Sequence, residues 1–313
     1  MKSGFAGGAA ATLVAVLIWG SQFPIAKDTF AIVDSFHVTA IRYGIGSLML
    51  VPILLWREGR SAFFLYGRFW PVMLLGLIGM CGSPMLMFLG IALSRPENAV
   101  IIVALQPSMT ALADWVVHGR RPANFTLGCM AIAFIGVVMV VMRGNPLRPP
   151  DDGELIGDFV VILGAVCWIV YTMSAESIKG WSALRFTTLT IIPGTLGNIA
   201  LTAVLVAAGQ LNVPSSAALF SVSWELSYLT VGGIVISMVC WNAGAQRIGA
   251  LNAMLLVSLM PVVTFGVRFA QGARFQASEI FGAALVIAAL IANNIYLRRM
   301  SSRINTAKRP IRN

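Results

Sequence analysis

The chain contains Asn98-Ala99-Val-Ile-Ile-Val-Ala-Leu-Gln-Pro107 and, 154 positions later, Asn252-Ala253-Met-Leu-Leu-Val-Ser-Leu-Met-Pro261. Each phrase carries an Asn-Ala pair and then a proline within an apolar run. A shift of 149 positions also places Trp19 on Trp168, within another apolar run. The second half of the chain therefore repeats the first.

The composition around these phrases is that of a membrane protein. Of the 313 residues, 58% are hydrophobic and 11% are charged, and the mean hydropathy is +0.84. A soluble domain is about 25% charged, so lipid must cover most of this surface. Crossing the hydrocarbon core takes roughly 20 apolar residues, and ten such spans are predicted: 9–27, 36–56, 69–91, 97–117, 123–142, 155–175, 185–208, 225–246, 251–271 and 277–297.

The predicted fold class follows from the repeat and the spans. Five spans per repeat is an odd number, so the two copies enter the membrane in opposite orientations. We expect an all-α integral membrane protein whose ten transmembrane helices form two inverted five-helix repeats around a central cavity. The predicted parts are a first repeat (1–147), a connector (148–154), a second repeat (155–300) and a basic cytoplasmic tail (301–313).

The distribution of basic residues predicts the orientation. With the N-terminus in the cytoplasm, 15 Lys and Arg residues lie on the inner side and six on the outer side. Positive residues favour the cytoplasmic side, so both termini are predicted to be cytoplasmic. The net charge of +10 does not indicate nucleic-acid binding, because six of the 22 basic residues lie in the last 16 positions, beside a span.

Several function classes find no support in the sequence. Each of the four cysteines lies in an apolar run, without the neighbouring ligands that a metal site needs. Hydrolase, zinc-protease, P-loop and dinucleotide-binding motifs are absent, so we expect no enzyme, no cofactor and no ATP-driven pump. The expected partners are a small-molecule substrate and the lipid bilayer, and the protein is expected to be a monomer or homodimer.

One segment identifies a family resemblance. The first span closes with Trp19-Gly20-Ser21-Gln22-Phe23-Pro24-Ile25-Ala26-Lys27. This run, together with the repeated Asn-Ala-x7-Pro phrase, resembles the EamA family of the drug/metabolite transporter superfamily. The resemblance implies ten helices, inverted repeats and a cavity walled by spans one to four and six to nine. It also implies a bacterial inner-membrane exporter of amino acids, other metabolites or toxic compounds that works by alternating access.

Polar or aromatic residues at membrane depth are the candidates for substrate binding, because lipid exposure would be costly for polar groups. An alternative for each is ordinary packing between helices. Arg42 lies about two turns inside the second span and needs a partner, water or an anionic group such as a substrate carboxylate. The predicted substrate-binding residues are Trp19, Gln22, Arg42, Trp168, Tyr171, Trp241 and Asn242.

Prolines within spans are the candidate hinges, because each removes a backbone hydrogen bond. Pro107 and Pro261 recur at matching positions of the two repeats, and Pro24 frees the carbonyl of Gly20. Matched helix interruptions are typical of transporter sites. For Asp114 and Glu176, near the inner side, both gating or proton coupling and simple capping of helix ends remain open.

The predicted function is secondary transport, with export of small organic metabolites across the inner membrane. Amino acids, with aromatic or apolar ones among the candidates, are the favoured substrates. One alternative is efflux of lipophilic cations or drugs, which needs a carboxylate in the cavity. Another is a membrane-embedded enzyme acting on lipid-linked substrates, which needs a paired acid and base at one membrane face.

Overall fold

A computed structural model of the chain describes residues 2–143, 151–175, 180–248 and 256–307, together with residues 178 and 253. The described residues form helices joined by short links and include no strand. The helices are α1 (Lys2–Thr29), α2 (Ser35–Glu58), η1 (Arg60–Phe63), α3 (Phe69–Leu75), η2 (Gly76–Gly82), α4 (Ser83–Leu93), α5 (Pro96–Ala104), α6 (Gln106–His118), α7 (Asn124–Val141), α8 (Asp152–Ala175), α9 (Ala183–Ala207), α10 (Ser216–Ser221), α11 (Ser223–Ser227), η3 (Tyr228–Ile236), α12 (Ser237–Ile248), α14 (Met260–Ala270) and α15 (Ala277–Ala307).

Within the described ranges, eight helical segments are long and apolar enough to cross a membrane. A ninth is the pair α5 and α6, if the two helices, which meet at 46°, count as one broken span. The shorter apolar helix α14 lies where the predicted span 251–271 ends, and most of the first residues of that span are outside the described part. The α15 helix continues to Ala307, into the region predicted as a basic tail.

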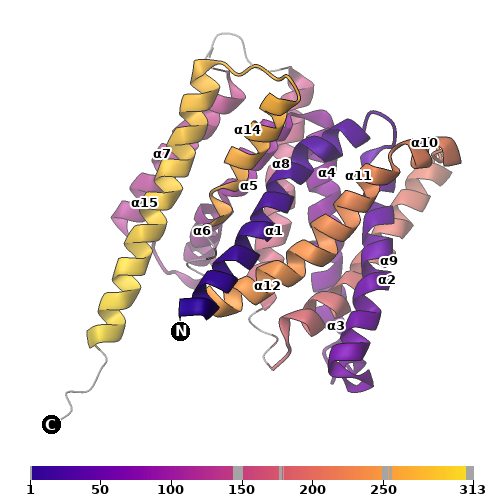
Figure 1. Cartoon of the computed structure of the whole chain (residues 1–313), viewed down its shortest axis with the longest axis horizontal. Coiled ribbons are helices and arrows are strands. Elements are labelled where there is room, and N and C mark those ends of the chain that lie inside the picture. The colour runs from indigo at the N-terminus through magenta and orange to yellow at the C-terminus, as the bar shows by residue number, and fades with distance from the viewer. Residues whose placement is uncertain are drawn as a thin grey trace.

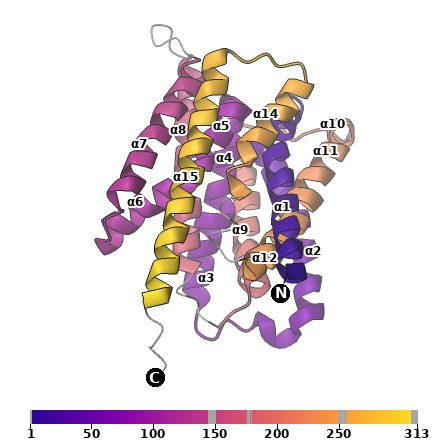
Figure 2. The ribbon, with the colours of Figure 1, turned by 60° about the vertical axis from the view of Figure 1, so that its left-hand side comes forward.

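The helices pack in pairs that the repeat relates to each other. The α4 helix of the first half packs against α8 of the second half, and the matching pair is α12 of the second half against α1 of the first. The α2 helix packs against α9, and α7 against α15 at one side of the bundle (Figures 1 and 2). A Cβ atom on Gly136 would lie 2.6 Å from the carbonyl oxygen of Gly282. The backbones of α7 and α15 therefore touch where both helices have glycine.

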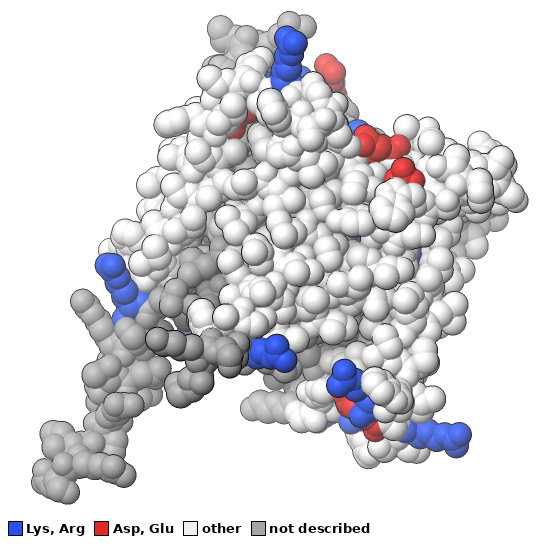
Figure 3. Space-filling model, viewed as in Figure 1, with Lys and Arg blue, Asp and Glu red and all other residues white. Residues whose placement is uncertain are grey.

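The two ends of the bundle differ in what they carry. The start of α1 and the end of α15 lie at the same end, which we call the terminal end (Figures 1 and 2). The opposite end, where α4 meets α5 and α14 meets α15, is the distal end. On the face shown in Figure 3, charged residues gather near these ends and uncharged residues cover the middle. Trp56 and Trp70 are 81% and 71% exposed near the terminal end, as interfacial aromatic residues are.

The two repeats have the same helix interruption before a proline. Leu105 has φ −76° and ψ −7°, and Leu259 has φ −83° and ψ −13°. Leu105 is the N-cap of α6 and Leu259 is the N-cap of α14. Pro107 and Pro261 lie in the first turns of these helices, where the missing N–H costs no hydrogen bond. The matched interruptions predicted from sequence are present, and motion about them stays a prediction.

Pro24 does not break its helix, in contrast to the hinge predicted there. The α1 helix continues through Pro24 to Thr29. The carbonyl of Gly20, which a proline four residues later cannot use, accepts a hydrogen bond from Thr264 Oγ1 at 2.6 Å. The freed carbonyl thus joins α1 to α14 rather than loosening α1.

Candidate substrate cavity

A cavity of about 260 Å³ lies within the bundle, between the helices of both halves. Five of the seven predicted substrate-binding residues line it: Trp19, Gln22, Arg42, Trp168 and Trp241. Pro107, one of the predicted hinges, also lies in the wall. The remaining lining residues are Phe23, Tyr43, Ser83, Pro84, Met87, Phe88, Val103, Gln106, Thr110, Ile169, Thr172, Gly233, Ile234, Met238, Val257 and Met260.

The cavity is closed toward the distal end. Lining residues on that side, such as Phe23, Ser83 and Phe88, are buried. Lining residues nearer the terminal end are more accessible, with Thr172 exposed and Trp241 partly exposed. The more accessible lining residues thus lie toward the terminal end in this conformation.

Arg42 is the buried cation of the cavity. Its side chain comes from α2 and the residue is only 4% exposed. One guanidinium nitrogen donates to Gln22 Oε1 at 3.2 Å, and the guanidinium carbon lies 4.3 Å from the centre of the Phe88 ring. The Nε atom is buried without a hydrogen-bond partner, and no carboxylate in the described part of the chain forms an ion pair with Arg42. A buried charge without a counter-charge destabilises the protein unless a ligand or a water molecule supplies the missing hydrogen-bond acceptor.

Gly233 keeps the space beside this cation open. A Cβ atom at Gly233 would lie 2.9 Å from Gln22 Oε1 and 3.2 Å from a guanidinium nitrogen of Arg42. The Gly233 carbonyl accepts a hydrogen bond from the indole nitrogen of Trp19 at 3.2 Å. Gly233 was not predicted as a cavity residue. The sequence feature that could have indicated it is the pair of adjacent glycines in the apolar segment after Tyr228.

Aromatic side chains form the wall nearer the terminal end. The rings of Trp19 and Trp241 lie 5.4 Å apart, and Trp168 contributes a third indole from α8. Met87 and Met238 add flexible apolar surface. An arginine at the closed side and aromatic faces at the open side suit a solute with an anionic head and an apolar body.

Tyr171, one of the predicted substrate-binding residues, is not among the residues that line this cavity. It is 5% exposed, its hydroxyl contacts Thr190 Oγ1 at 3.1 Å, and its ring stacks on Phe186 with centroids 5.2 Å apart. Sequence spacing placed it one turn from Trp168, but the neighbouring helix α9 fills the space beside it. The side chain of Asn242 and the residue Glu176 lie outside the described residues.

The other charged candidates take part in local contacts. Lys27 donates to the carbonyl oxygens of Ala92 and Ser94, both at 2.7 Å. Asp114 pairs with His118 within the same helix at 2.8 Å. Within the described ranges, the cavity lining includes neither aspartate nor glutamate, and no three side chains of metal-binding type are grouped. The arrangement is suited to binding a solute.

Known transporters resemble this chain over most of its length. The sequence profile of the EamA-like transporter family matches residues 6–142 and again residues 155–295. The uncharacterized transporter YrdR of Bacillus subtilis is 33% identical over 296 residues, which are 93% of this chain and 92% of that protein. An S-adenosylmethionine/S-adenosylhomocysteine transporter of Chlamydia muridarum is 22% identical over 76% of this chain and 75% of its own.

A solved structure shares the fold. The crystal structure of a protein whose sequence is 20% identical matches with a TM-score of 0.65, covering 94% of this chain and 99% of that chain. Two matches to one family profile, one in each half, also agree with the internal repeat seen in the sequence. The chain belongs to the EamA-like transporter family.

Proposed function

We propose that the protein is a secondary transporter that exports small organic metabolites bearing a carboxylate, most of all amino acids with aromatic or apolar side chains. The observation that carries the proposal is the buried guanidinium of Arg42, which lines the cavity with an unpartnered Nε. A substrate carboxylate would supply the missing counter-charge and hydrogen-bond acceptor.

The rest of the wall accommodates the other parts of an amino acid. Indole rings at Trp19 and Trp241 offer faces for an apolar or aromatic side chain, and also for an ammonium group. The name of the chlamydial relative supports the same chemical class. S-adenosylmethionine and S-adenosylhomocysteine each combine an amino-acid head with an aromatic base.

Alternating access follows as the mechanism. We propose ten spans in two inverted five-helix repeats, with both termini on the cytoplasmic side of the bacterial inner membrane. Helix pairs that correspond under the repeat support this arrangement, because two equivalent halves can expose a shared cavity to either side in turn. In this assignment the conformation described above faces the cytoplasm.

Efflux of lipophilic cations is the competing function within transport. That function calls for an anionic group in the cavity, whereas the described lining residues carry one cation and no carboxylate. An enzyme acting on lipid-linked substrates calls for an acid and a base together, and the named relatives are transporters.

Counterflow in proteoliposomes tests the proposal. Vesicles with the purified protein are loaded with one unlabelled solute at a time, and accumulation of the same labelled solute is followed. We expect exchange of apolar or aromatic amino acids and no exchange in protein-free vesicles. Exchange of tetraphenylphosphonium, with none of any amino acid or other carboxylate, would contradict the proposal.

A further inference from the structure

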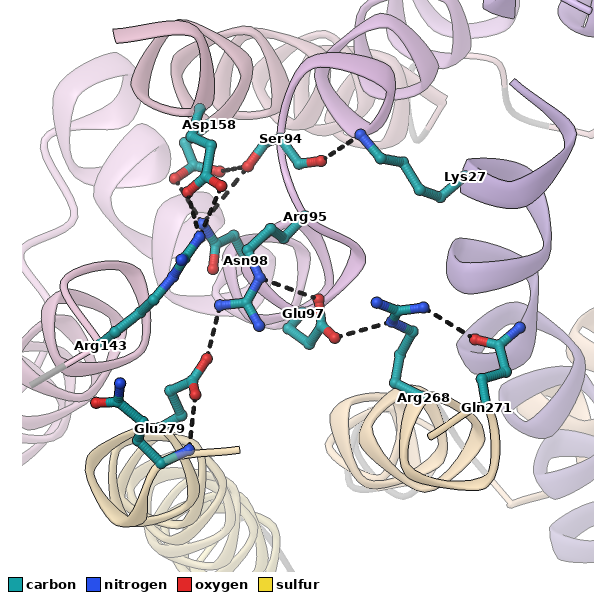
Figure 4. Close-up of polar contacts among 12 residues, drawn as sticks. Lys27, Ser94, Arg95, Glu97, Asn98, Arg143, Asp158, Arg268, Gln271 and Glu279 are labelled. Atoms are coloured by element: carbon teal, nitrogen blue, oxygen red, sulfur yellow. Dashed lines mark hydrogen bonds and ion pairs between the residues drawn. The ribbon is translucent and has the colours of Figure 1, made fainter. Parts of the chain in front are cut away.

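A chain of four alternating charges crosses the distal end of the bundle. Arg268 Nε donates to Glu97 Oε1 at 3.0 Å, and Glu97 Oε2 lies 3.7 Å from Arg95 Nε. Arg95 in turn donates to Glu279 Oε1 at 2.6 Å (Figure 4). We call these four residues the distal ion chain. It joins the start of α5, in the first half, to the end of α14 and the start of α15, in the second half.

Further polar contacts hold the segment between α4 and α5 in place. The ammonium group of Lys27, at the end of α1, donates to two carbonyls of this segment. Asp158, near the start of α8, accepts hydrogen bonds from Ser94 and, at 3.0 Å, from Asn98 Nδ2 (Figure 4). The segment is therefore tied to α1, α8, α14 and α15. The α5 helix runs on from it into the cavity wall at Val103.

The burial of the distal ion chain suits a contact that opens and closes. Glu97 is fully buried and Glu279 is 2% exposed, while the side chains of Arg95 and Arg268 are 21% and 27% exposed. Burial disfavours the charged form of Arg95, but Glu279 and Glu97 outweigh this and raise the pKa of Arg95. Paired buried charges roughly break even against hydration. Separating them into water therefore costs less than exposing an apolar contact of similar size.

The terminal end has no equivalent chain in its sequence. The repeat shift of 154 positions places Arg95 on Gly249 and Glu97 on Leu251. The same shift relates Arg268 to Asp114, which pairs with His118 in its own helix rather than with the other half. Charges that join the two halves at these positions are thus specific to the distal end.

We propose that the distal ion chain is the gate that closes the cavity at the distal end, with Glu97 as its central residue. Because the repeat supplies no counterpart at the other end, the gate favours the conformation in which the cavity opens toward the terminal end. The inference rests on the proposed function, since a gate has a role only if the cavity carries a solute across the membrane.

Labelling from the distal side tests the gate without any substrate. In a chain whose native cysteines are replaced by alanine, a single cysteine at Val103 reports access to the cavity. Membrane-impermeant maleimide is added to right-side-out or inside-out vesicles. A separate Gln271→Cys chain, exposed at the distal end, shows which vesicles present that end. Glu97→Gln should raise the distal labelling rate of Val103→Cys by about tenfold, as expected when one ion pair no longer favours closure.

Matched variants separate gating from general damage. Asp114→Asn removes a carboxylate whose partner lies in the same helix, and it should leave the labelling rate unchanged. Arg268→Gln should act like Glu97→Gln, and the double variant should label no faster than either single variant. All variants are compared at equal elution volume on size-exclusion chromatography. Folded Glu97→Gln and Arg268→Gln chains that both label at the parental rate would overturn the gate.

A covalent lock tests the same gate with the ion chain intact. Gln271 Nε2 donates to Asp28 Oδ2 at 2.7 Å, so these residues join α14 to α1 beside the gate. Cross-linking Asp28→Cys to Gln271→Cys with a short bis-maleimide should abolish distal labelling of Val103→Cys. Cross-linking Asp114→Cys to His118→Cys should leave that labelling unchanged. Full distal labelling in the locked chain would mean that the distal end is not the gate, whether or not amino acids are the substrates.

Discussion

At the scale of single residues, Arg42 is the clearest link between sequence and cavity. A cation inside an apolar helix needs a partner, and this requirement alone singled it out from the sequence. Polarity and aromaticity at membrane depth likewise selected Gln22, Trp19 and Trp168, which line the cavity. Gly233 was not predicted from the sequence. A glycine matters there because a Cβ atom would approach the Gln22 and Arg42 side chains, and only the fold shows which side chains face it.

Arg42→Gln should weaken binding of carboxylated substrates by between about tenfold and a hundredfold. The reason is that a hydrogen bond to a charged group contributes roughly 1.5–3 kcal/mol. Equilibrium binding of a labelled substrate to the purified protein measures the change. Arg57→Gln, an exposed arginine on the same helix, serves as control. Equal affinities of wild type and Arg42→Gln would contradict the proposal that Arg42 binds the substrate carboxylate.

Tyr171→Phe should lower stability without changing transport. Its hydroxyl is used in a buried contact with Thr190 rather than in the cavity. Losing that hydrogen bond costs about 1 kcal/mol. Thermal unfolding in detergent and the rate of substrate exchange, measured on one preparation, separate the two effects. A slowed exchange with unchanged unfolding would return Tyr171 to the substrate site.

At the scale of helices, the apolar runs predicted most boundaries within a few residues, and α2 and α9 are examples. The internal irregularities were less predictable. Two π-helical segments, η2 at Gly76–Gly82 and η3 at Tyr228–Ile236, start 152 positions apart in the two repeats. Such segments are rare and often lie at functional sites. They arise from tertiary packing, so the periodicity of apolar residues in the sequence does not predict them.

Pro107→Ala and Pro261→Ala should slow exchange more than they weaken binding. Each proline begins a helix after an interruption with the same backbone conformation at Leu105 and Leu259. Alanine can continue a helix through the break, so the two orientations of that span would interconvert less readily. The ratio of exchange rate to binding affinity measures this. Pro52→Ala, at a proline inside the unbroken helix α2, is the control.

A wild-type exchange rate in both Pro107→Ala and Pro261→Ala would contradict the prediction that these prolines act as hinges. In that case the π-helical segments η2 and η3 become the remaining matched irregularities of the two halves. Pro24 carries no such expectation, because the carbonyl that it frees is bound by Thr264.

At the scale of the whole molecule, the long apolar runs predicted an all-helical membrane fold, which the structure has, and the distribution of charge predicts the orientation. The start of α1 and the end of α15 lie at the same end of the bundle in Figures 1 and 2. The asymmetry between the ends was beyond prediction. Arg95 and Glu97 lie at least 171 positions from Arg268 and Glu279, and only the fold brings the two pairs together.

The proposed cytoplasmic location of both termini predicts a definite topology. Reporter fusions after Arg299 and within the connector 148–154 should report opposite sides of the membrane, with the Arg299 fusion in the cytoplasm. The expectation rests on the excess of basic residues on the inner side. If both fusions reported one side, the arrangement of ten spans in two inverted repeats would fail.

The central claim is that the cavity binds a carboxylate-bearing solute during transport. Its most direct test is competition in proteoliposome counterflow between an amino acid and its amide, such as phenylalanine and phenylalaninamide, at equal concentration. The two differ in the group that Arg42 is proposed to bind. The account predicts that the acid inhibits exchange at a concentration at least about tenfold lower than the amide does. Equal inhibition by both compounds, or stronger inhibition by the amide, would contradict it.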